Sequence, residues 1–146
     1  MNLVPSDVTH MPFLFVYGTL MRGLGESWQE RLGARFVGRG SVRAKLYDVA
    51  HYPGAVSTRT GSPERVKGEL YELASPEQAL RTLDEYEEFF PLQPERSLFV
   101  RKIVPVTLDD GTEKKAWVYL YNGEVHDSRQ ITSGDYRDKV VRTKES

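Results

Sequence analysis

The segment Tyr17-Gly18-Thr19-Leu20 is the first candidate for chemistry, because it joins a short apolar run to a loop. The run, residues 13–16, has the aromatic and β-branched residues typical of a buried strand. Gly18 permits backbone angles or a close approach that a Cβ would block. Successive N–H groups of such a loop, with the Thr19 hydroxyl, can hold a carboxylate or a developing oxyanion. A strand ending in Tyr-Gly is also a common form of ordinary turn, so the pattern alone leaves both interpretations open.

An acidic cluster at the end of a predicted helix is the second candidate. The helix begins at Ser75-Pro76-Glu77-Gln78, where the serine can cap it, the proline suits its first turn and the glutamine completes a capping box. It extends to about Tyr86 or Glu87. At 100° per residue, Glu87 falls inside the apolar sector and is predicted to face inward. The alternative is that the helix frays at this end. The predicted buried stripe comprises Ala79, Leu80, Leu83 and Tyr86. The acids predicted to turn toward solvent are Asp84, Glu85 and Glu88.

The elements that must position these residues are mostly strands. Alternation predicts a long strand over residues 34–49, in which Gly38 and Gly40 indicate a bulge or a barrel corner. Further strands are predicted at residues 66–73, 97–108 and 114–121. The last two are joined by a hairpin turn at Asp109-Asp110-Gly111. A short helix is predicted at residues 26–32. Together these elements indicate an α+β domain, and the pattern does not decide between an open sheet and a barrel.

His51, in a Tyr-Pro-Gly turn, is either a base or, more in keeping with its lack of an acidic partner, a surface residue.

Composition narrows the classes of function. The 146 residues suit one domain, which we place at residues 13–141 between a loose lead-in, residues 1–12, and a mobile tail, residues 142–146. With 20 basic and 21 acidic residues, no global field favours nucleic acid or an anionic membrane as a partner. The absence of cysteine and the wide spacing of three histidines argue against a metal site. Apolar runs are too short for a membrane span, so we expect a cytoplasmic protein. We also expect it to be a monomer or a weak homodimer.

The order of these pieces resembles the gamma-glutamylcyclotransferase-like family (gamma-glutamylamine cyclotransferase, AIG2-like). The resemblance rests on Tyr17-Gly18-Thr19-Leu20, Leu83-Asp84-Glu85-Tyr86-Glu87 and residues 66–71, 99–101 and 116–119. It implies a mixed six-stranded β-barrel with helices packed outside. It also implies release of an amine from a γ-glutamyl amide, with cyclisation of the glutamyl part to 5-oxoproline.

The resemblance further implies a role for each site residue. Glu87, the last residue of a Leu-Asp-x-aromatic-Glu motif, is expected to be the catalytic acid/base, and a carboxyl held against apolar neighbours would have a raised pKa. The Tyr17-Gly18-Thr19-Leu20 loop is expected to bind the substrate. Tyr119 matches a pocket-side tyrosine, with a core aromatic as an equal alternative. Because nucleophile and electrophile are tethered in one small molecule, no cofactor is required.

Two departures from the family pattern leave the substrate open. Glu88 stands where glycine is frequent and Phe99 where tyrosine is frequent. Amides of amino acids, of polyamines and of lysine all remain candidates for the γ-glutamyl substrate, with glutathione held lower. Two other classes of function also remain open: a non-catalytic module that binds an amino acid or amine, and a structural domain whose acids are all solvated.

Overall fold

The computed structural model describes residues 11–18, 20–21, 28–49, 52–58, 62–125 and 128–138. The strands are β1 (Phe13–Val16), β2 (Ala34–Val49), β3 (Tyr52–Ser57), β4 (Arg65–Leu73), β5 (Phe99–Leu108), β6 (Glu113–Tyr121) and β7 (Arg129–Gln130). The helices are α2 (Trp28–Arg31), α3 (Pro76–Tyr86) and the 3₁₀ turn η1 (Pro94–Arg96). Within these ranges, each helix is too short or too polar to cross a bilayer.

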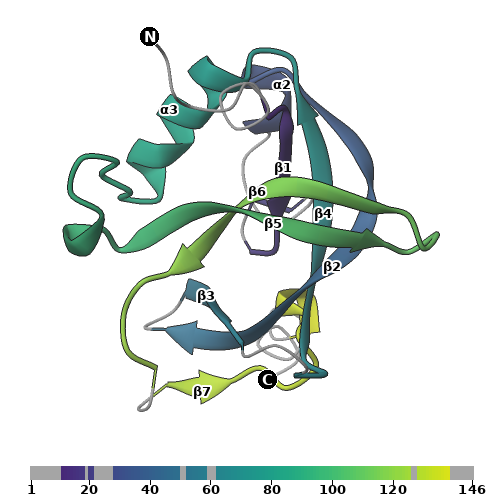
Figure 1. Ribbon diagram of the computed structural model, residues 1–146, viewed down its shortest axis with the longest axis vertical. Coiled ribbons are helices and arrows are strands. Elements are labelled where there is room, and N and C mark those ends of the chain that lie inside the picture. The colour runs from purple at the N-terminus through teal and green to yellow at the C-terminus, as the bar shows by residue number, and fades with distance from the viewer. Residues whose placement is uncertain are drawn as a thin grey trace, which may run out of the picture.

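Strand β2 organises the sheet, because its 16 residues pair with four other strands. Its first part pairs with β4, its last part with β3 and β7, and its middle meets β5. The order β3-β2-β4-β1-β6-β5 therefore closes through β2–β5 into a barrel, with β3 and β7 at the lower end in Figure 1. The β1–β6 pair is parallel and the others are antiparallel, so the predicted mixed barrel is confirmed. The short strand β7 makes seven strands where six were expected.

The predicted glycine bends in β2 are confirmed. The β2–β4 register shifts between Phe36 and Gly38, which marks a bulge. At Gly40, a Cβ would lie 2.5 Å from the Thr107 carbonyl oxygen and 3.0 Å from the Leu108 Cα. Only a residue without a side chain lets β5 approach this closely, and that approach closes the barrel.

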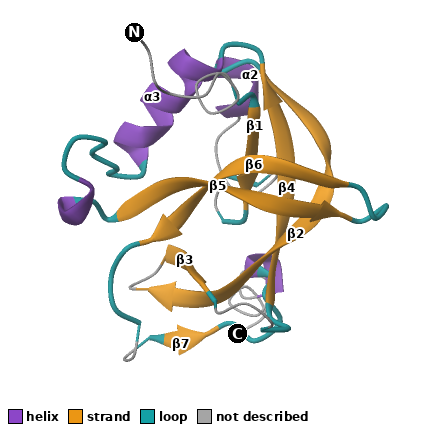
Figure 2. Ribbon diagram, viewed as in Figure 1, coloured by secondary structure: helices purple, strands orange, loops and turns teal. Residues whose placement is uncertain are grey.

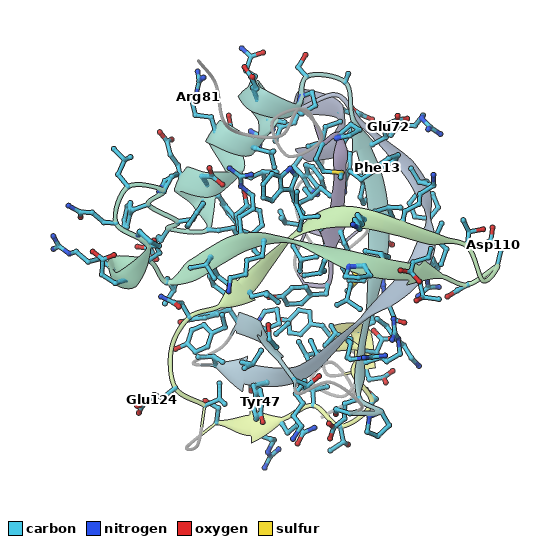
Figure 3. All side chains as sticks on the ribbon, in the orientation of Figure 1. Phe13, Tyr47, Glu72, Arg81, Asp110 and Glu124 are labelled. Carbon is cyan, nitrogen blue, oxygen red and sulfur yellow. The ribbon has the colours of Figure 1, made fainter. Side chains whose placement is uncertain are left out.

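The core fills the barrel and extends beneath the helices that cover its outside (Figure 2). Inside, Phe15 and Leu70 are almost completely buried, and each such side chain contributes about 1.5–3 kcal/mol. Outside, Trp28 of α2 packs edge-on against Tyr71 of β4, with ring centroids 5.2 Å apart. Figure 3 shows two positions on the surface: the Arg81 side chain projects from α3, and Asp110 lies at the tip of the β5–β6 hairpin.

Helix α3 differs from its prediction in two respects. Ser75 forms no side-chain cap, so the predicted capping box is wrong. The buried stripe is rotated toward Asp84, which is 8% exposed, and away from Tyr86, which is 63% exposed. The rotation has a physical cause, because the Asp84 carboxylate accepts hydrogen bonds from Arg101 of β5 and Tyr119 of β6. A helical wheel of apolar residues does not include such partners on neighbouring strands.

Candidate active site

A cavity of about 240 Å³ opens where β1 ends, β3 begins and α3 ends. Glu87 and residues of the loop that follows β1 both line it. The cavity brings together five of the predicted site residues, Tyr17, Gly18, Leu20, Glu87 and Tyr119. The sixth, Thr19, lies outside the described residues, as does His51.

The Tyr17 hydroxyl joins three strands behind the cavity. It donates a hydrogen bond to the Tyr119 carbonyl oxygen of β6 at 2.6 Å and accepts one from the Ala55 N–H of β3 at 3.1 Å. Burial raises the pKa of Tyr17, so the hydroxyl keeps its proton and remains a donor. Tyr17 therefore fixes the shape of the cavity, and its ring forms part of the wall.

Gly18 lies against Pro53 of β3. A Cβ at this position would lie 2.5 Å from Cγ of Pro53, so the glycine is required by close approach. Pro53 also lines the cavity, and its ring has little freedom to retreat.

The loop after β1 is held by hydrogen bonds that leave two amides unused. The Met21 N–H bonds the Gly18 carbonyl at 3.0 Å, and the Leu20 carbonyl accepts from the Trp28 indole N–H at 2.5 Å and from Gln29 at 3.2 Å. Within the described part of the chain, no acceptor takes the N–H of Gly18 or Leu20. Both residues line the cavity, so these donors suit a carboxylate or an oxyanion.

Glu87 occupies the C-terminal cap of α3 and is half-buried, as its position inside the apolar sector predicted. Burial raises the pKa of its carboxyl to about 7. Its side chain forms no hydrogen bond or ion pair with the described residues, so nothing in that part of the chain stabilises the ionised form. A carboxyl with this pKa can both take and return a proton near neutral pH.

Asp84, one turn before Glu87, forms a buried ion pair with Arg101 of β5. The Arg101 Nε and a terminal nitrogen donate to the two carboxylate oxygens at 2.8 and 3.1 Å. The guanidinium also lies over the rings of Trp117 and Phe89, with its carbon 4.2 and 5.7 Å from their centroids. This two-pronged pair between aromatic rings holds the end of α3 against the barrel.

Tyr119 completes the network from β6. Its hydroxyl donates to Asp84 Oδ1 at 2.7 Å, and burial, followed by the Asp84 carboxylate, raises the pKa of Tyr119. Residues three apart on a helix share a face, so fixing Asp84 also fixes the position of Glu87. The sequence prediction missed this role, which depends on Arg101 and Tyr119 of strands that are distant from the helix in sequence.

Comparison with known proteins gives the family. A family described as gamma-glutamyl cyclotransferase, AIG2-like, matches residues 14–138. The chain belongs to this family. It is 34% identical over 113 residues to the gamma-L-glutamyl-butirosin B gamma-glutamyl cyclotransferase of Niallia circulans, covering 77% of this chain and 68% of that protein. It is 30% identical over 128 residues to the gamma-glutamylcyclotransferase family protein YtfP of Escherichia coli, covering 86% and 96%.

Solved structures of the gamma-glutamyl cyclotransferase family agree with the barrel. An AIG2-like protein from Mus musculus superposes with a TM-score of 0.63 at 27% identity, over 80% of each chain. Within the described residues of this member, no group of three or more histidine or acidic side chains is placed to hold a metal ion.

The Asp84 network predicts that Asp84→Asn destabilises the protein. Arg101 would keep its charge in a buried place without a counter-ion, and loss of one partner of such a pair costs about 3–5 kcal/mol. Chemical denaturation measures this loss, with Glu85→Gln on the exposed face of the same turn as the control, expected within about 0.5 kcal/mol of the parent. Equal stabilities for the two variants would contradict the network.

The contact between Gly18 and Pro53 predicts that Gly18→Ala impairs the site. The added methyl group must displace the loop or Pro53, and a shift of this size at a binding site lowers kcat/KM by up to about 10²-fold. The control is Gly38→Ala, where a Cβ would meet only Leu108 Cδ2 at 3.7 Å. If both alanine variants keep parental kcat/KM, the close approach has no bearing on the site.

Proposed function

We propose that this protein is a γ-glutamyl amide cyclotransferase that releases an amine and 5-oxoproline. The observation that carries the proposal is that one cavity brings together the half-buried Glu87 carboxyl and two backbone amides, those of Gly18 and Leu20, that have no acceptor among the described residues. Burial raises the pKa of Glu87 to about 7. The carboxyl suits proton transfer and the amides suit an anion. The relative from Niallia circulans, whose name assigns it a gamma-L-glutamyl-butirosin substrate, supports the same class of reaction.

The substrate binds with its α-carboxylate or its reacting carbonyl oxygen on the amides of Gly18 and Leu20. Its glutamyl chain then folds so that the α-amino nitrogen reaches the γ-carbonyl carbon. Ring closure to a five-membered lactam is intramolecular, so the cavity has only to hold the folded conformer and exclude others. The ring of Tyr17 and the Tyr119 side chain form walls suited to this task.

Glu87 moves the protons. Its carboxylate takes a proton from the substrate's α-ammonium, and the freed amine attacks the γ-carbonyl carbon to form the ring C–N bond. Negative charge develops on the carbonyl oxygen, where N–H donors stabilise it. The protonated Glu87 then gives its proton to the departing amine nitrogen as the original C–N bond breaks. The regenerated carboxylate takes the remaining extra proton from the ring nitrogen and passes it to the released amine, which leaves as its ammonium, so the proton count balances without a cofactor.

The direct test is to incubate the purified chain with γ-glutamyl amides of amino acids, lysine, polyamines and simple alkylamines, and to assay 5-oxoproline together with the released amine. Equal amounts of both products support the proposal. Hydrolysis to free glutamate, or binding without product, would replace it with a hydrolase or a binding module.

Substitution of Glu87 by glutamine separates catalysis from stability. Turnover should fall by about 10²-fold or more, because the amide cannot take and return a proton. Burial raises the pKa of Glu87 to about 7 from an ordinary value near 4.5, so the folded state binds more protons than the unfolded state between these values. The tighter proton binding stabilises the folded state fully below about pH 4.5, and this stabilisation is lost as the pH rises to about 7.

The melting temperature of Glu87→Gln relative to that of the parent should therefore increase as the pH rises from 4.5 to 8. The two melting temperatures should be closest at the acid end of this range. The matched control Glu85→Gln removes the same charge from a solvent-exposed position and should keep the parental turnover and pH dependence. Retained turnover with a lowered melting temperature in Glu87→Gln would show that Glu87 is structural.

A further inference from the structure

Glu88 stands in a backbone conformation that favours glycine. Its φ is +53°, in the left-handed region, and it is the one described residue other than glycine with a positive φ. Its N–H bonds the Glu85 carbonyl at 3.2 Å and the Phe89 N–H bonds the Asp84 carbonyl at 2.8 Å, the pattern of a Schellman motif. Glycine commonly fills this position, and any other residue costs about 1–2 kcal/mol there.

The side chain of Glu88 lies at the junction of two cavities. It lines the inner cavity with Glu87, and it also lines an outer cleft of about 360 Å³ bounded by η1 and the end of β6. Leu98 is the other residue common to both. We refer to the space beside Glu88 and Leu98, where the two cavities adjoin, as the passage.

Aromatic side chains surround the same passage. Tyr52, Phe99 and Tyr86 line the inner cavity, and Tyr121 packs behind the first two, with ring centroids 6.4 and 5.6 Å away. Partial burial raises the pKa of Tyr52, followed by the effects of Tyr121 and of the Glu88 charge, which places that carboxylate near the rings. Aromatic faces beside a carboxylate suit an organic cation.

The charges of the inner cavity have one sign. Its described lining residues carry two acids, Glu87 and Glu88, and no base. In the proposed reaction, the positive charge of the substrate's α-ammonium neutralises the negative charge of the Glu87 carboxylate. The Glu88 side chain forms no ion pair or hydrogen bond with the described residues. The described lining of the outer cleft includes Glu88, Glu95 and Arg96, so acids outnumber bases there too.

We propose that Glu88 selects γ-glutamyl amides whose leaving amine carries a second, distal ammonium group, which binds between the Glu88 carboxylate and the aromatic rings of the passage. This inference rests on the proposed function. The leaving amine extends from the γ-carbonyl past Glu88 toward the outer cleft. A distal ammonium gains a charge-assisted contact there, an alkyl group gains none, and a carboxylate is repelled.

Three amides of matched length test the proposal: γ-glutamyl-cadaverine, with a distal ammonium, γ-glutamyl-hexylamine, with a distal methyl group, and γ-glutamyl-aminocaproate, with a distal carboxylate. For the parent, kcat/KM for the cadaverine amide should exceed that for the hexylamine amide by about 10-fold, and the aminocaproate amide should be poorest. The preference should shrink as the salt concentration rises. In Glu88→Gln it should fall to about twofold or less, chiefly through KM, while Glu85→Gln keeps the parental ratio.

Glu88→Gly provides a second variant that folds without strain. It should be at least as stable as the parent and yet lose the preference, which separates selection from structural damage. A parental preference retained in Glu88→Gln or Glu88→Gly overturns the proposal, as does a parent that favours the aminocaproate amide, which would assign the passage to Arg96.

Binding measurements distinguish failure of this inference from failure of the proposed function. If no amide yields 5-oxoproline, the cyclotransferase proposal fails, and titration calorimetry with the same three amides still tests Glu88. Tighter binding of the cadaverine amide by the parent, lost in Glu88→Gln, supports selection by Glu88 on a binding protein. Equal binding of the cadaverine and hexylamine amides overturns it.

Discussion

The ion pair between Asp84 and Arg101 is the constraint on which the site depends. It joins the last turn of α3 to β5, and the Tyr119 hydroxyl ties the same carboxylate to β6. Glu87 follows one turn later, so its place at the cavity is set by a contact that it does not make itself. A buried charge pair adds little net stability, but loss of one partner is costly, so the arrangement favours one position of the helix end over others.

The barrel supplies the other half of the site. The length of β2 and the close approach at Gly40 bring β5 against β2, and closure places the start of β3, the end of β1 and β6 around one opening. Tyr17 then bonds both β6 and β3, so the loop that carries the free amides is fixed from behind. Gly18 and Leu20 of this loop and Glu87 thus line one cavity, an arrangement that suits the proposed reaction, which needs a folded substrate and little motion.

Features decided by local chemistry were predictable from the sequence. The hairpin turn at Asp109-Asp110-Gly111 needs a left-handed residue, and Gly111 has a φ of +91°. The inward position of Glu87 follows from helical periodicity alone. The mixed barrel was not decided by pattern, because closure depends on a contact between Gly40 and Thr107 that are far apart in sequence.

Features decided by distant partners were missed for the same reason. Asp84 was assigned to solvent because its partners, Arg101 and Tyr119, lie on strands that the helix does not specify. The contact of Gly18 with Pro53 likewise joins segments that meet only in the folded barrel. Glu88 was correctly placed outside the apolar stripe, yet its position at the mouth of the cavity depends on the backbone reversal at +53°. A helical wheel contains no information on that reversal.

The central claim is that burial, with no compensating partner among the described residues, moves the pKa of the Glu87 carboxyl into the range where it can exchange protons near neutral pH. The most direct measurement is an NMR titration of the Glu87 side-chain carboxyl carbon in the parent protein, assigned by its loss in Glu87→Gln. The account predicts a midpoint near pH 7. A midpoint near the ordinary value of 4.5, in the folded protein, would contradict it.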